Sequence, residues 1–315
     1  MLIGILAGLT TCALWGLTFV APRAVDPFSA WDLTVARYGT FGLACAVLML
    51  HRRFRPVGFS TIRLTIGLLL GGAGYVGYFV SAAFAVQLTG AAMPPLIIGT
   101  MPVFLALIAN SRDRSVPWRS LALPLGLIAT GVAIVNASVF AAAPSGSSMT
   151  ISLGLAAAGA ALAIWIIYGL INAAVMRADD APDGLHWTGL QGIGAALGSL
   201  SLLPLTSFGT VAAVPAADTY RFAAWALMMG IAGSWLATWC WVAASRRLPL
   251  ALSAQLIVGE TIFGLVYGFI FETRWPMTSE WIGAALQITG VCAAIGAFSR
   301  PAAPVVTSER SVAGA

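Results

Sequence analysis

One carboxyl residue, Glu260, lies deep inside an apolar stretch of the sequence. The stretch covers residues 250–271, and Glu260 comes about ten residues after its start. If the stretch crosses a membrane as a helix, a rise of ~1.5 Å per residue places Glu260 at ~15 Å depth, close to the midplane. A charged, unpaired carboxylate there costs several kcal/mol, so such a residue is normally functional or paired. A protonated or helix-bonded glutamate with only a structural role is the alternative.

A basic residue is also embedded in apolar sequence. Arg37 lies about six residues into the stretch 31–50, or ~9 Å from the nearer membrane face if the stretch is helical. Its long side chain could snorkel to that face. Pairing with Asp32 or Glu260 is the alternative, and the sequence leaves both open.

Aromatic residues with polar tips recur in the middle of several apolar stretches. In membrane proteins Trp and Tyr concentrate at the interfaces, so residues deep in a span need another explanation. They suit stacking on an apolar ligand or cation–π contact with a cationic one. Core packing is the alternative for any one of them. These residues are Trp15, Tyr75, Tyr78, Trp165, Tyr168, Trp235, Trp239 and Tyr267.

Three more residues complete the candidate binding site. Met101 and Pro102 predict an irregular helix within residues 91–110, because proline leaves a backbone carbonyl without its helical partner. Gln255 offers an amide on the same stretch as Glu260. Five positions correspond to about 500° around a helix, so these two side chains are expected on different flanks.

One acidic motif suggests enzyme chemistry instead. Residues 179–183 have the Asp-Asp-x-x-Asp spacing that holds Mg²⁺-diphosphate in isoprenoid enzymes, but such enzymes need a second acidic cluster at the same cavity, and the sequence has none. His51 and His186 have no partner pattern, and there is no phosphate-binding glycine loop. We therefore expect a solvated loop at 179–183 and a protein that is not an enzyme and has no metal site and no cofactor.

The composition identifies the elements that must position these residues. Charged residues make up only 9% of the chain, against about a quarter in soluble domains. The chain is thus expected to be a polytopic membrane protein in the lipid bilayer, with no nucleic-acid partner despite its net charge of +5. A span needs about 20 apolar residues. The sequence predicts ten, near 2–20, 31–50, 62–86, 91–110, 120–136, 151–175, 186–206, 221–245, 250–271 and 279–298.

The arginines predict the orientation of these spans, because positive residues collect on the cytoplasmic side. All 16 basic residues are arginine. With the N-terminus in the cytoplasm, the side opposite to it keeps only Arg23, Arg221 and Arg274. Both termini are then cytoplasmic, in a bacterial inner membrane.

The chain also contains an internal repeat. Matching residues recur 159 positions apart: Ala92 and Ala251, Ile98 and Ile257, Phe104 and Phe263, Ser120 and Ser279, and the Thr-Gly-Val runs 130–132 and 289–291. Five spans in each half give the halves opposite orientations, which is typical of alternating-access transporters with a substrate site between the repeats. The sequence predicts a first repeat over 1–136, a second over 151–298 and a disordered cytoplasmic tail over 299–315. The connector 137–150 is expected outside.

The same stretches resemble EamA-type members of the drug/metabolite transporter superfamily. The resemblance covers residues 1 to about 298. The residues that carry it are the run 13–16 (Ala-Leu-Trp-Gly), Arg37, the run 101–104 (Met-Pro-Val-Phe), the run 259–263 (Gly-Glu-Thr-Ile-Phe) and Glu272. Thr261 replaces the family's usual proline, and Phe271 replaces the glycine before Glu272. The resemblance implies an all-α fold of ten helices in two inverted five-helix repeats, with a cavity lined by spans 1, 3, 4, 6, 8 and 9.

Repeat, midplane carboxyl and resemblance together favour a secondary transporter. We expect export of a small amino-acid-like or amphipathic solute, with protons as the candidate coupling ion at Glu260. An exchanger of phosphorylated or nucleotide-sugar metabolites is the alternative within transport, and a membrane-embedded enzyme is a weaker one.

Overall fold

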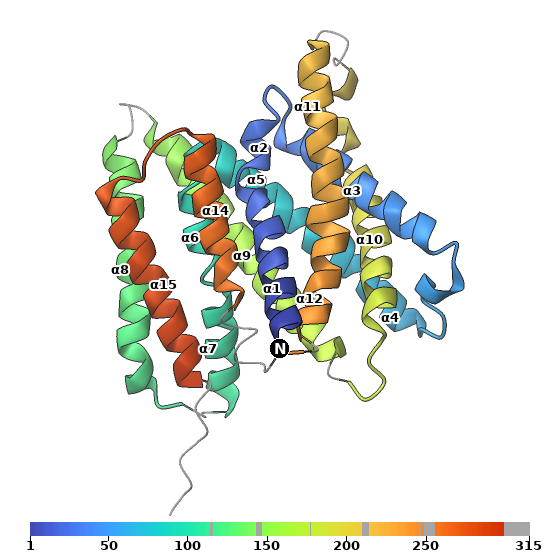
Figure 1. Cartoon of the computed structure of the whole chain (residues 1–315), viewed down its shortest axis with the longest axis horizontal. Helices are drawn as coiled ribbons and strands as arrows, with labels where there is room; N and C mark the ends of the chain where they lie inside the picture. The colour runs from blue at the N-terminus through green and yellow to red at the C-terminus, as the bar shows by residue number, and fades with distance from the viewer. Residues whose placement is uncertain are drawn as a thin grey trace, which may run out of the picture.

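The computed structural model is a bundle of helices (Figure 1). It describes residues 1–113, 116–142, 147–176, 178–209, 214–245, 247–248 and 256–298. Every regular element in this part of the chain is helical. The tail 299–315 and Gln255 lie outside the described residues.

The described residues of the first half form eight α-helices and the short segments between them. They are α1 (Leu2–Gly16), η1 (Leu17–Phe19), α2 (Ala21–Ala24), α3 (Ala30–Leu48), η2 (Arg52–Phe54), α4 (Thr61–Leu69), η3 (Leu70–Tyr75), α5 (Val76–Thr89), α6 (Met93–Ile98), α7 (Met101–Asp113) and α8 (Trp118–Ala142). The second half contains α9 (Ser148–Met176), α10 (Gly184–Leu200), η4 (Leu203–Leu205), α11 (Ala216–Leu227), η6 (Met228–Leu236), α12 (Ala237–Ser245), α14 (Val258–Phe271) and α15 (Thr278–Phe298).

Six helices in the described part of the chain are long and apolar enough to cross a membrane. They cover Leu2–Phe19, Thr61–Thr89, Trp118–Ser138, Ser148–Met176, Ala216–Ala244 and Thr278–Ala297. The other four predicted spans coincide with helices that are shorter or less apolar, namely α3, the pair α6 and α7, α10 and α14. The structure therefore supports a multi-pass membrane protein with six clear spans, and a total of ten stays a prediction.

The main helix contacts join the first half of the chain to the second. Helix α8 packs along α15, α3 along α10, α5 along α9, and α1 against both α12 and α14. Figure 1 shows α8 and α15 side by side at one edge of the bundle. Because these partners are far apart in sequence, the two halves form one packed unit.

Two long helices contain a π-helical segment at matching places. Segment η3 lies between α4 and α5, and η6 lies between α11 and α12. Gly71 in η3 approaches the Gln191 carbonyl oxygen of α10 so closely that a Cβ atom would overlap it. Gly230 in η6 lies just as close to Thr40 of α3. These two glycines are 159 positions apart, the offset of the repeat.

A network of ion pairs joins helix ends on the side of the bundle opposite to the start of α1 (Figure 1). Glu272 accepts hydrogen bonds from Arg23 Nη1 at 2.5 Å and Arg274 Nε at 2.7 Å. Arg274 also donates to both oxygens of the buried Glu280, at 2.6 and 2.7 Å. The hydrogen bonds with Glu280, followed by those with Glu272, raise the pKa of Arg274 above its ordinary value. The network connects α2 to the loop between α14 and α15.

Candidate functional site

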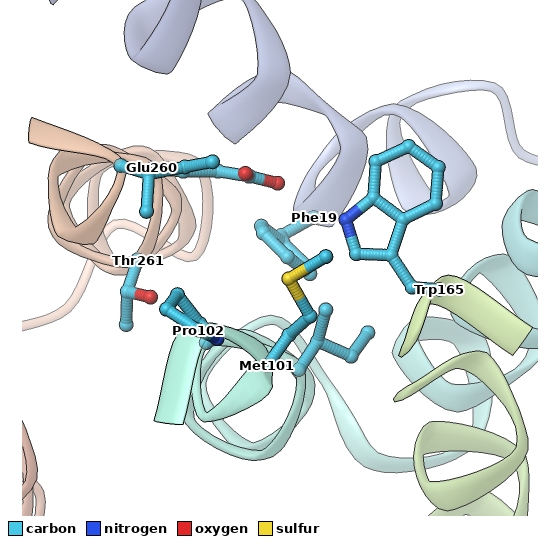
Figure 2. Close-up of a pocket in the computed structure, with 9 residues that line it drawn as sticks. Phe19, Met101, Pro102, Trp165, Glu260 and Thr261 are labelled. Atoms are coloured by element: carbon cyan, nitrogen blue, oxygen red, sulfur yellow. The ribbon is translucent and has the colours of Figure 1, made fainter. Parts of the chain in front are cut away.

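A cavity lies where η1, α6, α7, α9 and α14 meet. Figure 2 shows Glu260 and Thr261 on one side, Met101 and Pro102 below, and Trp165 and Phe19 across from Glu260. The full lining is Phe19, Ile98, Gly99, Met101, Pro102, Trp165, Ile257, Glu260 and Thr261. Its volume is about 20 Å³, room for about one water molecule. In this conformation the lining side chains leave little free space between them.

The cavity wall uses matching positions from both halves of the chain. Three pairs of lining residues are each 159 positions apart: Ile98 and Ile257, Met101 and Glu260, and Pro102 and Thr261. This offset is that of the internal repeat. Equivalent parts of the two halves thus face each other here, but the second half supplies a carboxyl group where the first supplies a thioether.

The backbone is interrupted on the first-half side of the cavity. Helix α6 ends at Ile98 and α7 begins at Met101, so the predicted span 91–110 is two helices. The interruption precedes Pro102, which lies in the first turn of α7, where a missing backbone N–H is tolerated. Gly99 is required in the interruption, because a Cβ atom there would overlap the Thr261 hydroxyl. Thr261 in turn donates to the Pro95 carbonyl at 3.4 Å.

Glu260 lies in the first turn of α14, and its carboxyl group points into the cavity (Figure 2). No described residue donates a hydrogen bond to it or forms an ion pair with it. The titratable groups close enough for Coulomb interaction are Arg37 from α3, Tyr78 from α5 and Cys12 from α1. The start of a helix favours negative charge. The site thus holds a carboxyl group that is available to a ligand or a proton.

Arg37 does not snorkel to a membrane face. Arg37 is only 6% exposed, and its guanidinium carbon lies over the Phe79 ring, 4.3 Å from the ring centroid. Nε donates to Ser234 Oγ at 3.2 Å and Nη1 to Thr18 Oγ1 at 3.5 Å. Pairing with Asp32 is also ruled out, because Asp32 caps α3 and accepts hydrogen bonds from Ser29 and Ser207. Arg37 and Glu260 do not form an ion pair.

Three aromatic side chains stack behind the cavity. Trp165 and Tyr168 of α9 are parallel within 5°, with ring centroids 4.6 Å apart. The Tyr78 ring of α5 stacks on the same indole at 4.6 Å. Such stacking fixes the orientation of Trp165, the member that lines the cavity.

A hydrogen-bonded chain of side chains supports this aromatic stack. The hydroxyls of Tyr75 and Tyr168 both lie within hydrogen-bond distance of Gln191 Oε1, at 2.7 and 3.0 Å. Gln191 Nε2 donates to Asn172 Oδ1 at 3.2 Å, and Trp187 Nε1 donates to the same oxygen at 2.7 Å. An indole nitrogen can only donate, so it fixes the Asn172 amide and through it Gln191. Tyr75 and Tyr168 are therefore held in place from α10.

The remaining tryptophans that the sequence predicts for the site lie outside the cavity lining. Trp15 does not line the cavity, and its ring packs against Trp241 at 6.0 Å. Trp235 packs against the core cluster that includes Phe79. Trp239 is 47% exposed and does not line the cavity. An apolar helix with no polar face gives no signal of which side is inward.

Several lining residues are missed by sequence reasoning. Phe19 and Gly99 carry no signal of their own, because an apolar or small residue in an apolar span is typical everywhere. Thr261 was marked only as a departure from the family's pattern. Ile98 and Ile257 are marked by the repeat alone. Equivalent positions in the two halves are therefore the signal that would find more of the wall.

The acidic loop 179–183 has structural roles. Asp180 forms an ion pair with Arg63 at 2.6 Å, and its hydrogen bond with Arg63 lowers the pKa of the exposed Asp180 carboxyl. Asp183 accepts a hydrogen bond from Leu185 N at the start of α10. The loop thus links α4 to the start of α10.

Trp165 and Trp15 should respond differently to truncation. We expect Trp165→Ala to reduce solute flux more than it reduces stability, because it removes a stacking wall worth about 0.5–1.5 kcal/mol beyond its area. Trp15→Ala should lower stability and flux together, because that ring packs against Trp241 and does not line the cavity. Flux in liposomes and the thermal unfolding midpoint of each purified variant test this. Parallel losses of flux and stability in both variants would assign Trp165 to packing.

Two comparisons with known proteins agree with a membrane fold. The chain is 29% identical over 326 residues to the "Inner membrane protein YtfF" of Escherichia coli (strain K12), covering 98% of this chain and 99% of that protein. It also matches a solved structure titled "Crystal structure of protein" with a TM-score of 0.61 and 18% identity, covering 94% of this chain and 98% of that one. No family model matches the sequence.

These findings establish the membrane location but not the family. With six apolar helices and a full-length relative from the inner membrane, the chain is a multi-pass inner membrane protein surrounded by lipid. The solved structure shows a shared fold only. Membership of the EamA-type transporters stays a prediction.

Proposed function

We propose that the chain is a secondary transporter of the EamA type, an exporter of small amphipathic or amino-acid-like solutes that works by alternating access. The observation that carries the proposal is the cavity between the two halves, lined by equivalent residues and bearing one carboxyl group. In inverted-repeat transporters, substrate sites lie at the repeat interface near the midplane and use discontinuous helices. The interruption between α6 and α7 fits that description.

The packing of the halves supports the same proposal. If the ten predicted spans are correct, the contact of α5 with α9 joins spans 3 and 6, and the contact of α1 with α12 joins spans 1 and 8. In each contact the third span of one half meets the first span of the other, so the two contacts are equivalent when the halves over 1–136 and 151–298 are exchanged. Gly71 and Gly230 occupy matching π-helical segments in the same way. A rocking motion of one half against the other would open the small cavity to each side in turn.

Glu260 is the proposed coupling residue. Its carboxyl group faces the cavity and has no hydrogen-bond donor among the described residues, so it can exchange a proton or bind a cationic group. Arg37, Tyr78 and Cys12 are the titratable groups that influence it. In the proposed cycle, solute leaves the cell while a proton on Glu260 moves inward.

Two other functions receive less support. An exchanger of phosphorylated metabolites would need several cations at the cavity, and Arg37 is the one buried arginine in the described part of the chain. A membrane-embedded enzyme would need the acidic loop for metal binding, but Asp180 and Asp183 there hold Arg63 and the start of α10. We therefore propose a transporter without catalytic activity.

Flux measurements on the purified protein test the proposal. The protein would be reconstituted in liposomes containing a pH-sensitive dye, and amino acids, nucleosides and cationic amphiphiles would be added in turn. We expect at least one of these classes to change the internal pH faster than in protein-free liposomes. Folded protein that shows no solute-dependent proton movement and no solute flux with any class would refute the transporter function.

A further inference from the structure

The carboxylate of Glu272 joins three segments of the chain at the end of the bundle that the arginines predict to be outside. Its Oε1 atom accepts hydrogen bonds from Arg23 Nη1 of α2 at 2.5 Å and from the backbone nitrogen of Ala91, just before α6, at 3.3 Å. Its Oε2 atom accepts from Arg274 Nε at 2.7 Å. Arg23 and Ala91 belong to the first half of the chain, and Arg274 belongs to the second. One carboxylate oxygen thus bonds the other half, and the second oxygen bonds its own half.

Each joined segment continues into an element that lines the cavity. In the first half, α2 follows η1, which supplies Phe19, and α6 ends at Ile98. In the second half, α14 is 14 residues (~20 Å) long, with Glu260 in its first turn and Glu272 directly after its last residue. An opening of the cavity toward this end, between the two halves, would separate α14 from α2 and α6. It would therefore break the hydrogen bonds of Glu272 Oε1.

The surrounding chain leaves space for this carboxylate and orients it. Gly90 has a backbone φ of 83°, which favours glycine, and a Cβ atom there would lie only 3.2 Å from Glu272 Oε1 and 3.5 Å from Arg23 Nη1. Arg274 is itself held by both carboxylate oxygens of Glu280. The Glu272 side chain is 14% exposed, against 40% for Arg23. The second half therefore presents an oriented acceptor, and the first half supplies the more exposed donor.

We propose that the Glu272 carboxylate is a latch that holds the outer side of the transporter closed. In the closed state Oε1 bonds Arg23 and Ala91. On opening, these bonds break while the bond of Oε2 with Arg274 persists. A partly exposed ion pair contributes little free energy, so the latch opens reversibly and sets the ratio of outward-open to outward-closed molecules. This inference rests on the proposed alternating access and adds the contact that controls one of its two openings.

Chemical labelling of the cavity from each side of the membrane tests the latch without any substrate. Met101→Cys places one thiol in the cavity wall of a parent chain whose own cysteines are replaced by alanine. The replaced residues are Cys12, Cys45, Cys240 and Cys292. A membrane-impermeant thiol reagent is added to right-side-out vesicles and, separately, to inside-out vesicles. The rate of labelling then reports how often the cavity is open to each side.

Loss of the latch should shift the two labelling rates in opposite directions. Glu272→Gln and Arg23→Gln should each raise labelling from outside about 3- to 10-fold, because a charge-assisted hydrogen bond between the halves is weakened. Labelling from inside should fall, since a molecule that is open to one side is closed to the other. The double variant should match Glu272→Gln alone, because both changes remove the same interaction. Asp218→Asn is the control, since its ion pair with Arg221 lies within α11 and joins no two segments. It should leave both rates unchanged.

Other outcomes would overturn the inference. If both labelling rates rose together, Glu272 would stabilise the fold rather than one state of it. If neither rate changed, or if the effects of the two single variants multiplied in the double variant, the bond between Glu272 and Arg23 would not control the opening. If Glu272→Gln does not fold, Arg23→Gln decides, because Arg23 is the more exposed partner. The proposed function fails separately: a Met101→Cys thiol that reacts from only one side, or from neither, in every variant would refute alternating access and the latch with it.

Discussion

Replacing Glu260 with glutamine is expected to uncouple transport from the proton gradient. Glutamine keeps the shape of the side chain but cannot take up or release a proton. With a pH gradient across liposomes, solute flux through Glu260→Gln should fall to the level of protein-free liposomes, while exchange of solute for solute persists. The measurement is the flux of labelled solute with and without the gradient, together with the internal pH.

A matched control removes a carboxylate elsewhere. Asp180→Asn neutralises an exposed loop residue beside Arg63. Because the Arg63 hydrogen bond lowers the pKa of Asp180, this group stays ionised at neutral pH in the parent and does not titrate in the tested range. Asp180→Asn should therefore keep gradient-driven flux. If Glu260→Gln depended on the gradient as the parent does, Glu260 would be structural and the coupling proposal would fail.

The positions of the helices were predictable from the sequence because a bilayer constrains length and hydropathy together. The stretch 62–86 corresponds to the continuous helix Thr61–Thr89, and 151–175 to Ser148–Met176. The irregular segments were not predictable to the residue. The interruption before Met101 depends on Gly99 packing against Thr261 in the other half of the chain, a contact that is not local in sequence.

The site was predictable where a residue conflicts with its surroundings. Glu260, Trp165, Met101 and Pro102 all line the cavity. Glu260, Trp165 and Pro102 are unusual residues for the middle of an apolar span, and Met101 was marked by the proline that follows it. The supporting contacts could not be inferred in the same way. That Arg37 meets Ser234 rather than Asp32 depends on how η6 packs on α3, and hydropathy does not carry that information.

The close packing at Gly71 leads to the second large effect that we expect. In Gly71→Ala the added methyl group would overlap the Gln191 carbonyl oxygen, a backbone atom that cannot rotate away. Overpacking costs about 1–3 kcal/mol, which exceeds the ~1 kcal/mol that alanine gains over glycine in a helix. Gly126→Ala in α8 is the control, because a methyl group added there would have no neighbouring atom within 4 Å.

The two variants should therefore differ in stability. We expect Gly71→Ala to lower the thermal unfolding midpoint in detergent and Gly126→Ala to leave it unchanged or raise it. Flux should also fall in Gly71→Ala, because displacing α10 moves Gln191 and with it the Tyr75 and Tyr168 hydroxyls beside Trp165. An unchanged midpoint in Gly71→Ala would mean that η3 and α10 are not in close contact. If Gly230→Ala gave a matching loss, the two halves would be equivalent at this position in packing energy as well as in sequence.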